Sequence, residues 1–301
     1  MSRTLVVILS ETRASELTFE NFEKNVLQPL DADLCVCIGV KDGYDYSDPF
    51  YRTAKYCFEY PEPNDYGSAF DYASECIQKR LGIVSAMHWR KFLKVKNQFM
   101  GGIKDPKHQH PGSAGILIFF RWFLMKNIIE NNLLEKYDRF VITRSDFLYR
   151  MPHCPLHLLD PSCIWIPDSE GYGGYTDRHV ILSKENIEQY LNILDNMVIR
   201  SKEYFTKMIH HSKWNLEQLI KFHLNMNGVV DKVRQFPYVM YAVRNIDGTT
   251  RWSAGKFNKE LGYYVKYQSE YDKSAMYKKS LDDDFNGDLT TFYSEKINAL
   301  I

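Results

Sequence analysis

The sequence predicts an α/β fold with a central, mostly parallel sheet flanked by helices, similar in kind to a Rossmann sheet. Short apolar runs rich in β-branched and aromatic residues recur along the chain, as in Leu5–Leu9 and Leu34–Val40. Segments with helical spacing separate these runs, which is typical of buried parallel strands joined by helices. No internal repeat or low-complexity linker interrupts the 301 residues. One large domain is the simplest organisation for a chain of this length.

The amino-terminal elements predict a strand–helix–strand unit. Leu5–Leu9 is the first strand, a helix follows from about Thr18 and ends at Pro29, and Leu34–Val40 is the second strand. Such a unit implies a parallel pair of strands with a right-handed crossover.

The later elements alternate in the same way and lead to a polar, tyrosine-rich end. We expect the following elements in order: a strand near Tyr56–Tyr60, a helix over Ala69–Leu81, a helix over Ala114–Leu134, a strand within Asp138–Asp146, strands at Cys163–Pro167 and His179–Leu182, a helix of about 16 residues from Ser183, a helix near Asn215–Asn227 and a strand at Phe236–Val243. We expect residues 1–245 to form the α/β domain and residues 246–301 to form a carboxyl-terminal extension that packs on it.

Composition excludes several classes of protein. Lys+Arg and Asp+Glu both total 38, and this balance argues against nucleic-acid binding, which needs a basic surface. The apolar block at the amino terminus, Leu5–Leu9, is too short for a signal peptide or a membrane span. None of the six cysteines forms a C-x-x-C pair, which favours free thiols in a reducing compartment. We therefore expect a cytoplasmic protein, in the host cytoplasm if the source is a virus.

A polar cluster follows the apolar run Phe140–Ile142. Ligands of open α/β sheets bind beyond the carboxyl ends of the strands, where Arg144, Ser145 and Asp146 fall. Mg²⁺ and Mn²⁺ are commonly held by one or two carboxylates together with substrate phosphates. The alternative is structural: Asp146 caps the next turn and Arg144 forms a surface ion pair.

A second polar segment is rich in glycine. Gly173 and Gly174 would let the backbone approach a ligand closely, and Asp177 and Arg178 follow them. Arg178 is suited to binding a diphosphate, and Asp177 to accepting a proton. The alternative is a tight hairpin in which Asp177 and Arg178 pair on the surface.

Together these segments resemble GT-A-fold glycosyltransferases that use nucleotide sugars. The resemblance is carried by Tyr137–Asp146, Trp165–Pro167 and Gly173–His179. The sequence is similar in particular to bacterial and large-virus members of the family with an R-S-D or R-P-D strand end. Leu5–Ile8 and Glu11–Arg13 also resemble the start of such proteins. The resemblance covers roughly residues 1–230.

The resemblance implies a donor site for a UDP- or GDP-sugar. Asp146 would be the last residue of a D-x-D-like motif and would hold Mn²⁺ or Mg²⁺ on the donor diphosphate, with Ser145 in the middle position. Arg144 stands where the first Asp is expected, and it would itself neutralise phosphate charge. Arg13 would contact the nucleotide, although a surface role is the alternative. Gly173, Gly174 and Arg178 would complete the donor site.

The acceptor would be a glycan hydroxyl, and its activation needs a base. Asp177 is the first candidate and Glu217 its rival, whereas a retaining enzyme would place a carboxylate on the opposite face of the sugar. The alternative for Glu217 is structural: it lies at the start of a helix, where a carboxylate stabilises the helix through the helix dipole.

The histidines are further ligand candidates. His179, His210, His211 and His223 are possible second metal ligands, and His179 precedes an apolar strand, which favours a structural role. His108 and His110 are chelating types on one loop, but the sequence identifies no third partner for them.

Two other functions compete with glycosyl transfer. The missing first Asp favours a glycan- or nucleotide-binding protein that kept the fold and lost catalysis. A nucleotidyltransferase would need a glycine-rich loop after the first strand, and Ser10–Arg13 contains no glycine. A P-loop enzyme is disfavoured because no G-x-x-x-x-G-K-[ST] motif occurs.

Overall fold

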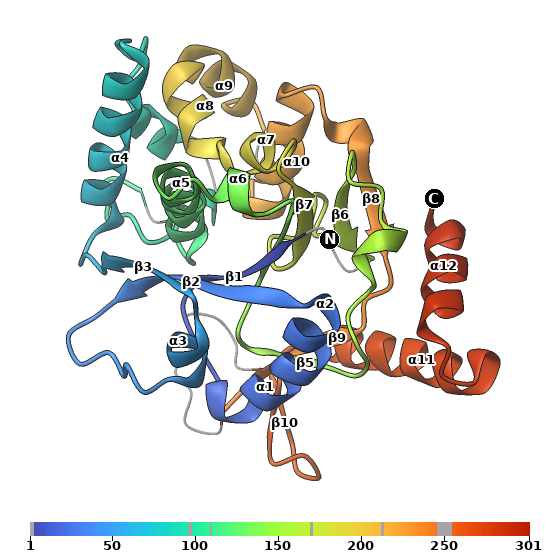
Figure 1. The fold of residues 1–301 in the computed structure, drawn as a ribbon. Helices are drawn as coiled ribbons and strands as arrows, with labels where there is room; N and C mark the ends of the chain where they lie inside the picture. Colours follow the sequence, from blue (N-terminus) through green and yellow to red (C-terminus); the bar gives the residue numbers. More distant parts are fainter. Residues whose placement is uncertain (1–2, 96–97, 109, 169–170, 212–213, 246–254) are drawn as a thin grey trace.

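The computed structural model describes residues 3–95, 98–108, 110–168, 171–211, 214–245 and 255–301. A central sheet divides the molecule, with one group of helices above it and a smaller sheet and further helices below it (Figure 1). This arrangement confirms the predicted α/β class.

The central sheet has seven strands in the order β3-β2-β1-β4-β7-β6-β8. Their bounds are β1 Thr4–Ser10, β2 Ala32–Val40, β3 Tyr56–Pro61, β4 Arg139–Thr143, β6 Ile164–Pro167, β7 Val180–Ser183 and β8 Val233–Phe236. Strand β7 is antiparallel to both of its neighbours, and the other pairings are parallel. The chain runs outward from β1 through β2 and β3 and then returns to β4 on the other side of β1. The strand order therefore reverses between β1 and β4.

Both faces of this sheet are buried, which explains its apolar strands. Leu5 and Val7 of β1 face one core cluster, which includes Phe119 of helix α5 (Ala114–Glu130). Val6 and Ile8 face the opposite cluster with Phe22. Alternate residues of a strand point to opposite faces, so a strand covered on both sides must be apolar throughout.

Helices cover both faces of the sheet. The α-helices are α1 Ser15–Phe22, α2 Gln28–Leu30, α3 Pro49–Thr53, α4 Tyr66–Leu81, α5, α6 Leu133–Lys136, α7 Ile187–Leu191, α8 Ile193–Ile199, α9 Ser201–Met208, α10 Leu216–Met226, α11 Gln268–Phe285 and α12 Leu289–Leu300. A π-helical turn, η1 Glu23–Leu27, joins α1 to α2, and the 3₁₀ helices are η2 Trp89–Lys94, η3 Gln98–Met100, η4 Leu156–Leu158 and η5 Val230–Lys232. Helix α5 is buried between the sheet and α4 and α8, which explains its apolar residues on all sides.

Three expected boundaries are wrong. The first helix continues past Pro29 to Leu30, because the carbonyl of Asn25 accepts a hydrogen bond from the His153 amide at 2.7 Å instead of from the missing proline N–H. Ser183 ends strand β7, and the helix expected from it is divided into α7 and α8. The strand expected at Phe236–Val243 is two strands in different sheets, separated by a segment containing Pro237.

The smaller sheet combines strands from distant parts of the chain. Its order is β10-β11-β9-β5, with β5 Phe147–Tyr149, β9 Met240–Arg244, β10 Lys256–Asn258 and β11 Tyr263–Val265. Strand β11 pairs with β9, and the Tyr277 hydroxyl of α11 donates to the Asp168 carboxylate at 2.6 Å. The carboxyl-terminal residues from 256 onward thus contact the core through both a strand pairing and a buried hydrogen bond.

Within the described part of the chain, each helix is too short or too polar to cross a lipid bilayer.

Candidate active site

A cleft of about 460 Å³ opens at the carboxyl ends of β1 and β4, where the strand order reverses. Open α/β sheets bind ligands at this position because the loops of adjacent strands diverge there. Residues from six segments line the cleft: 9–13, 112–117, 142–146, 172–178, 215–217 and 266–267. The predicted candidates Arg13, Arg144, Ser145, Asp146, Asp177, Arg178 and Glu217 all line it.

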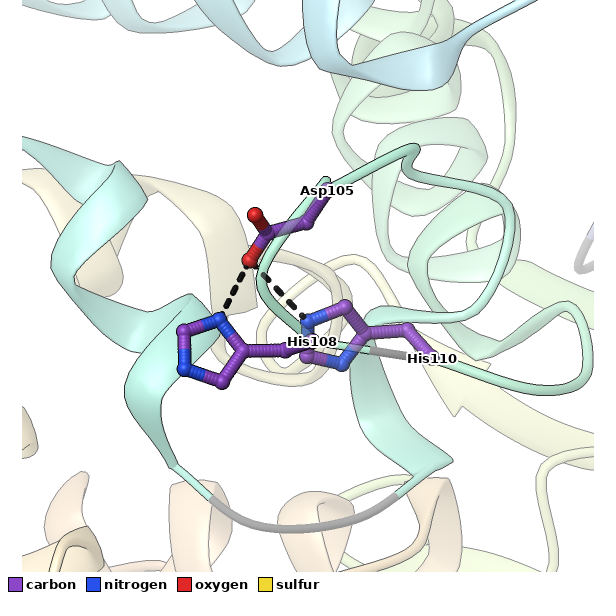
Figure 2. Close-up of side chains that lie close together, drawn as sticks. All are labelled: Asp105, His108 and His110. Carbon is purple, nitrogen blue, oxygen red and sulfur yellow. Dashed lines mark hydrogen bonds and ion pairs between the residues drawn. The ribbon is translucent and has the colours of Figure 1, made fainter.

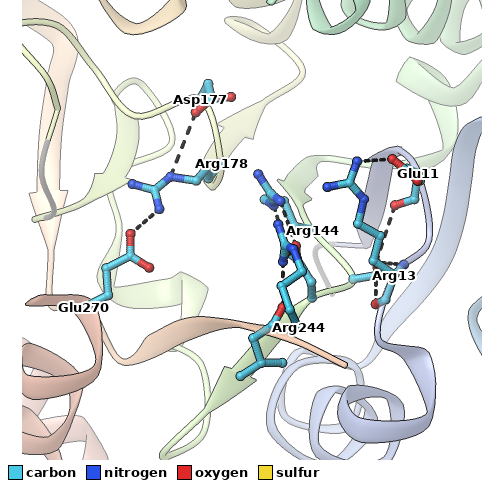
Figure 3. A network of polar contacts seen from close by, with 10 residues as sticks. Glu11, Arg13, Arg144, Asp177, Arg178, Arg244 and Glu270 are labelled. Carbon is cyan, nitrogen blue, oxygen red and sulfur yellow. Dashed lines mark hydrogen bonds and ion pairs between the residues drawn. The ribbon is translucent and has the colours of Figure 1, made fainter. Parts of the chain in front are cut away.

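Ser145 joins the two strand-end loops. Its hydroxyl oxygen accepts a hydrogen bond from the Arg13 amide at 2.7 Å and lies 3.2 Å from the Arg13 carbonyl. The Arg13 guanidinium forms an ion pair with Glu11 at the cleft (Figure 3). The loop after β1 is therefore fixed to the loop after β4.

Asp146 is buried beneath guanidinium groups. It is 1% exposed, and Arg144 donates to both of its carboxylate oxygens, at 2.8 and 2.7 Å. Arg244, the last residue of β9, also pairs with it. Burial by itself would raise the pKa of Asp146, but the charges of Arg144 and Arg244 outweigh burial and hold that pKa well below its usual range.

The resemblance implied a divalent metal at Asp146, and the residues there do not fit one. Both carboxylate oxygens already accept hydrogen bonds from arginine, and a cation would have to displace them. Among the described residues, a cluster of three carboxylate, imidazole or thiolate ligands occurs at Asp105, His108 and His110 but not in the cleft. Arg144 and Arg244 place positive charge at the position where the resemblance implied the cation.

Four basic side chains form what we call the cationic cluster. Arg144, Arg178 and Lys266 line the cleft, and Arg244 does not line it but pairs with Asp146. Arg178 is 5% exposed and pairs with Glu270 of α11, so its predicted alternative as a surface residue is wrong (Figure 3). Lys266 follows β11, and burial together with the charges of Arg144 and Arg244 lowers its pKa to about 7.

Two arginines of the cationic cluster have N–H groups with no hydrogen-bond partner in the part of the chain that the structure describes. Arg178 Nη2 and Arg244 Nε and Nη2 are buried without a hydrogen-bond partner among the described residues. Buried donors left unpaired cost stability.

Asp177 and Glu217 form a second group, which we call the carboxylate pair. Glu217 is in the first turn of α10, which Asn215 caps by accepting from the Gln218 amide at 2.8 Å. Burial and the negative charge of Asp177 raise the pKa of Glu217 to about 7. A carboxylate with this pKa exchanges protons near neutral pH, as a general base must.

Gly173 and Gly174 are not among the residues that line the cleft, and their expected role in donor binding stays a prediction. A Cβ at Gly174 would lie 1.9 Å from the Glu217 carbonyl oxygen, and the Tyr175 amide donates to that oxygen at 3.0 Å. A Cβ at Gly173 would lie 3.0 Å from Gln218 Nε2. The close approach that glycine permits is therefore to α10, and it brings Asp177 and Glu217 together.

The histidine candidates lie outside the cleft lining. His179 is buried, with its ring nitrogens 2.9 Å from Thr143 Oγ1 and 3.2 Å from the His153 ring, so its structural role is confirmed. His223 is buried against Tyr204. His210 and His211 are exposed.

Two site residues were missed from the sequence. Arg244 directly follows the expected strand Phe236–Val243, and its position as a polar residue at a strand end could have identified it as a site candidate. Lys266 lies in the expected extension, and no local pattern marks it, because only the pairing of β11 with β9 brings it to the cleft.

No family model matches the sequence, and no curated protein matches it. Among solved structures, mouse xyloside xylosyltransferase 1 in its apo form is similar, with 8% identity and a TM-score of 0.37 over 78% of this chain and 85% of that one. A protein from Desulfovibrio desulfuricans named as a nucleotide-diphospho-sugar transferase has 14% identity and a TM-score of 0.35, over 78% of this chain and 80% of that one. At this level of similarity, function has to be argued from the residues of the cleft.

Proposed function

We propose that this protein is a GT-A-like glycosyltransferase that moves a sugar from a nucleoside-diphosphate donor to a glycan hydroxyl. One observation carries the proposal: a single cleft at the switch point of the sheet combines the cationic cluster with a carboxylate of pKa about 7. A diphosphate needs the first group and an acceptor hydroxyl needs the second. The resemblance of Tyr137–Asp146 and Gly173–His179 to nucleotide-sugar enzymes supports the same assignment.

The cationic cluster would bind the donor diphosphate. Arg144, Arg178 and Lys266 line the cleft, and guanidinium groups bind phosphate oxygens in bidentate fashion. As the bond from the anomeric carbon to the diphosphate breaks, negative charge grows on the leaving oxygen. Fixed cations stabilise that charge without reorganisation. Asp146 would hold Arg144 and Arg244 in place for this purpose. Arg13, in the loop after β1, would contact the nucleotide.

Glu217 would act as the base. It accepts the proton of the acceptor hydroxyl as that oxygen bonds to the anomeric carbon, and the nucleoside diphosphate departs with the electron pair of the broken bond. Asp177 would raise the proton affinity of Glu217, because the negative charge of Asp177 is one cause of the raised pKa of Glu217. The first-ranked sequence candidate, Asp177, thus takes a supporting role in this proposal and its rival Glu217 the direct one.

A second candidate is a nucleotide- or glycan-binding protein without catalysis. It is favoured by Asp146, whose carboxylate is fully occupied by Arg144 and Arg244. In this case the cleft would bind a diphosphate and transfer nothing.

One experiment separates the two candidates. The protein is incubated with UDP-, GDP- and TDP-sugars and a panel of glycan acceptors, with Mn²⁺ or with EDTA, while nucleotide release and thermal shift are followed. Release that depends on acceptor and persists in EDTA supports the transferase and its metal-free cleft. A thermal shift without release supports the binding protein. Neither signal with any donor would refute both.

A further inference from the structure

The loop between η3 and α5 is closed at its base. A Cβ at Gly101 would lie 2.4 Å from the Gly112 carbonyl carbon, and the Ile116 amide donates to the Gly101 carbonyl at 3.3 Å. The two ends of the loop are thus in backbone contact. Gly112 and Ser113 at this base line the cleft, so the shape of the loop bears on the cleft.

Within this loop the structure supplies the third partner that the sequence did not identify for His108 and His110. Asp105 Oδ2 lies 2.6 Å from His108 Nδ1 and 3.9 Å from His110 Nε2 (Figure 2). The potential ligand atoms of the three residues all lie within 4.8 Å of one another. The spacing Asp-x-x-His-x-His therefore converges on one point.

The surroundings of Asp105 suit a ligand. Its other oxygen, Oδ1, accepts a hydrogen bond from the Lys107 amide at 3.0 Å, which orients Oδ2 toward the two imidazoles. That hydrogen bond and the one from His108 lower the pKa of Asp105, so the carboxylate is ionised at neutral pH. Metal-binding carboxylates are commonly oriented by such outer hydrogen bonds.

One of the three side chains, that of His108, is exposed to solvent. The side chains of His110 and Asp105 are 2% and 10% exposed, whereas that of His108 is 42% exposed. An ion would enter past His108, and water would complete its coordination. None of the three residues lines the cleft, so this position is separate from the diphosphate site.

We propose that Asp105, His108 and His110 form a zinc site that fixes this loop. Ligands about 2.1 Å from a tetrahedral zinc ion lie about 3.4 Å apart, between the two distances from Asp105 Oδ2. Two imidazoles and one carboxylate suit Zn²⁺ among divalent ions, and they bind it more strongly than Mg²⁺ or Mn²⁺. Zinc would take the place of the hydrogen bond between Asp105 and His108 and would tie both residues to His110. The proposal does not depend on glycosyl transfer.

The test is a direct measurement of binding. Protein made without a histidine tag is stripped with EDTA, dialysed, and titrated with Zn²⁺ against a chromophoric chelator, with Co²⁺ as a spectroscopic probe. We expect one Zn²⁺ per chain, a higher Tm, and slower amide hydrogen exchange in residues 101–112. Affinity should fall as pH decreases, because protons compete with the metal for the imidazole nitrogens.

Variants locate the ion. We expect His108→Ala and Asp105→Asn each to weaken zinc binding at least about tenfold, and the asparagine retains an oxygen that can accept from the Lys107 amide. His157→Ala, which removes an exposed histidine elsewhere, is the matched control and should bind as the native protein does. The proposal is overturned if the native protein shows no saturable 1:1 binding, or if His108→Ala and Asp105→Asn bind zinc as tightly as His157→Ala.

Discussion

Two carboxylates of the same cleft have opposite environments. Asp146 is surrounded by guanidinium groups, which keep its pKa far below the usual range. Glu217 is partly buried beside another carboxylate, Asp177, and its pKa rises to about 7. Both lie on loops or helix starts that the sheet topology brings together.

The difference indicates a division of roles. A carboxylate that is always ionised and held by Arg144 and Arg244 positions cations and does not exchange protons. A carboxylate with a pKa near neutrality can accept a proton and release it again. The carboxylate pair is thus suited to proton transfer, whereas Asp146 is suited to building the anion site.

The largest expected effect is on Glu217. We expect Glu217→Gln to lower the transfer rate by about 10² to 10⁴-fold, because the base is lost while the shape is kept. In the native protein the rate should rise with pH through about 7, as Glu217 loses its proton, and this dependence should vanish in the variant. Rates across pH with one donor measure both effects. Glu203→Gln, at an exposed helix position, is the control. An unchanged rate in Glu217→Gln would return the role of base to Asp177.

The next effect is on stability and concerns Asp146. We expect Asp146→Asn to lower the free energy of unfolding by about 3 to 5 kcal/mol, because Arg144 and Arg244 would keep buried charges without a partner. The pKa of Asp146 is lower in the folded than in the unfolded protein. The stability that the ionised carboxylate contributes is therefore present above the ordinary carboxyl pKa and is lost as pH falls from there toward the lowered pKa. Urea unfolding at several pH values measures it.

A control for Asp146 is the exposed Asp138, which pairs with Lys184. We expect Asp138→Asn to cost about 1 kcal/mol or less. Equal losses in the two variants would contradict the view that the arginines depend on Asp146.

A smaller effect tests how the carboxylate pair is positioned. Gly174→Ala should lower the free energy of unfolding by about 1 to 3 kcal/mol and also slow transfer, because the new Cβ would push against the Glu217 backbone. Gly43→Ala is the comparison: its φ of +79° is strained for alanine, but beyond the adjacent residues no heavy atom would lie within 4 Å of the new Cβ. We expect Gly43→Ala to lose stability alone. Slower transfer in both variants would remove the specific role of Gly174.

The smallest effect concerns Lys266, whose pKa of about 7 makes it a pH-dependent member of the cationic cluster. We expect Lys266→Met to weaken nucleoside-diphosphate binding about tenfold when the lysine is charged, near pH 6. The loss should shrink above pH 7, where Lys266 is largely neutral. Calorimetric titration at the two ends of this range measures the difference, with Lys184→Met as the exposed control. A loss independent of pH would contradict the lowered pKa.

Much of the fold could be predicted because it depends on local patterns. The apolar runs at Leu5–Leu9 and Leu34–Val40 became β1 and β2, and the helix expected over Ala69–Leu81 became α4. The errors occurred where a distant contact replaced a local signal. Pro29 did not end its helix, because His153, far along the chain, donates the hydrogen bond that the Asn25 carbonyl would otherwise lack.

The candidate site was predictable to the same extent. The polar cluster after an apolar run identified Arg144 and Asp146, and the glycine-rich segment identified Asp177 and Arg178. All four line the cleft. The sequence did not show that Gly173 and Gly174 lie against helix α10, because that contact joins distant parts of the chain.

The sequence by itself determined the class of fold, the strand ends that face the cleft and the chemical types available there. Only the tertiary structure decided what each group does. Asp146 was expected to hold a metal, but Arg244 at the end of β9 forms an ion pair with its carboxylate. Glu217 is a candidate base because burial and the nearby charge of Asp177 raise its pKa. The physical reason is that a side chain's charge and proton affinity depend on neighbours within a few ångströms, and folding brings those neighbours from distant parts of the chain.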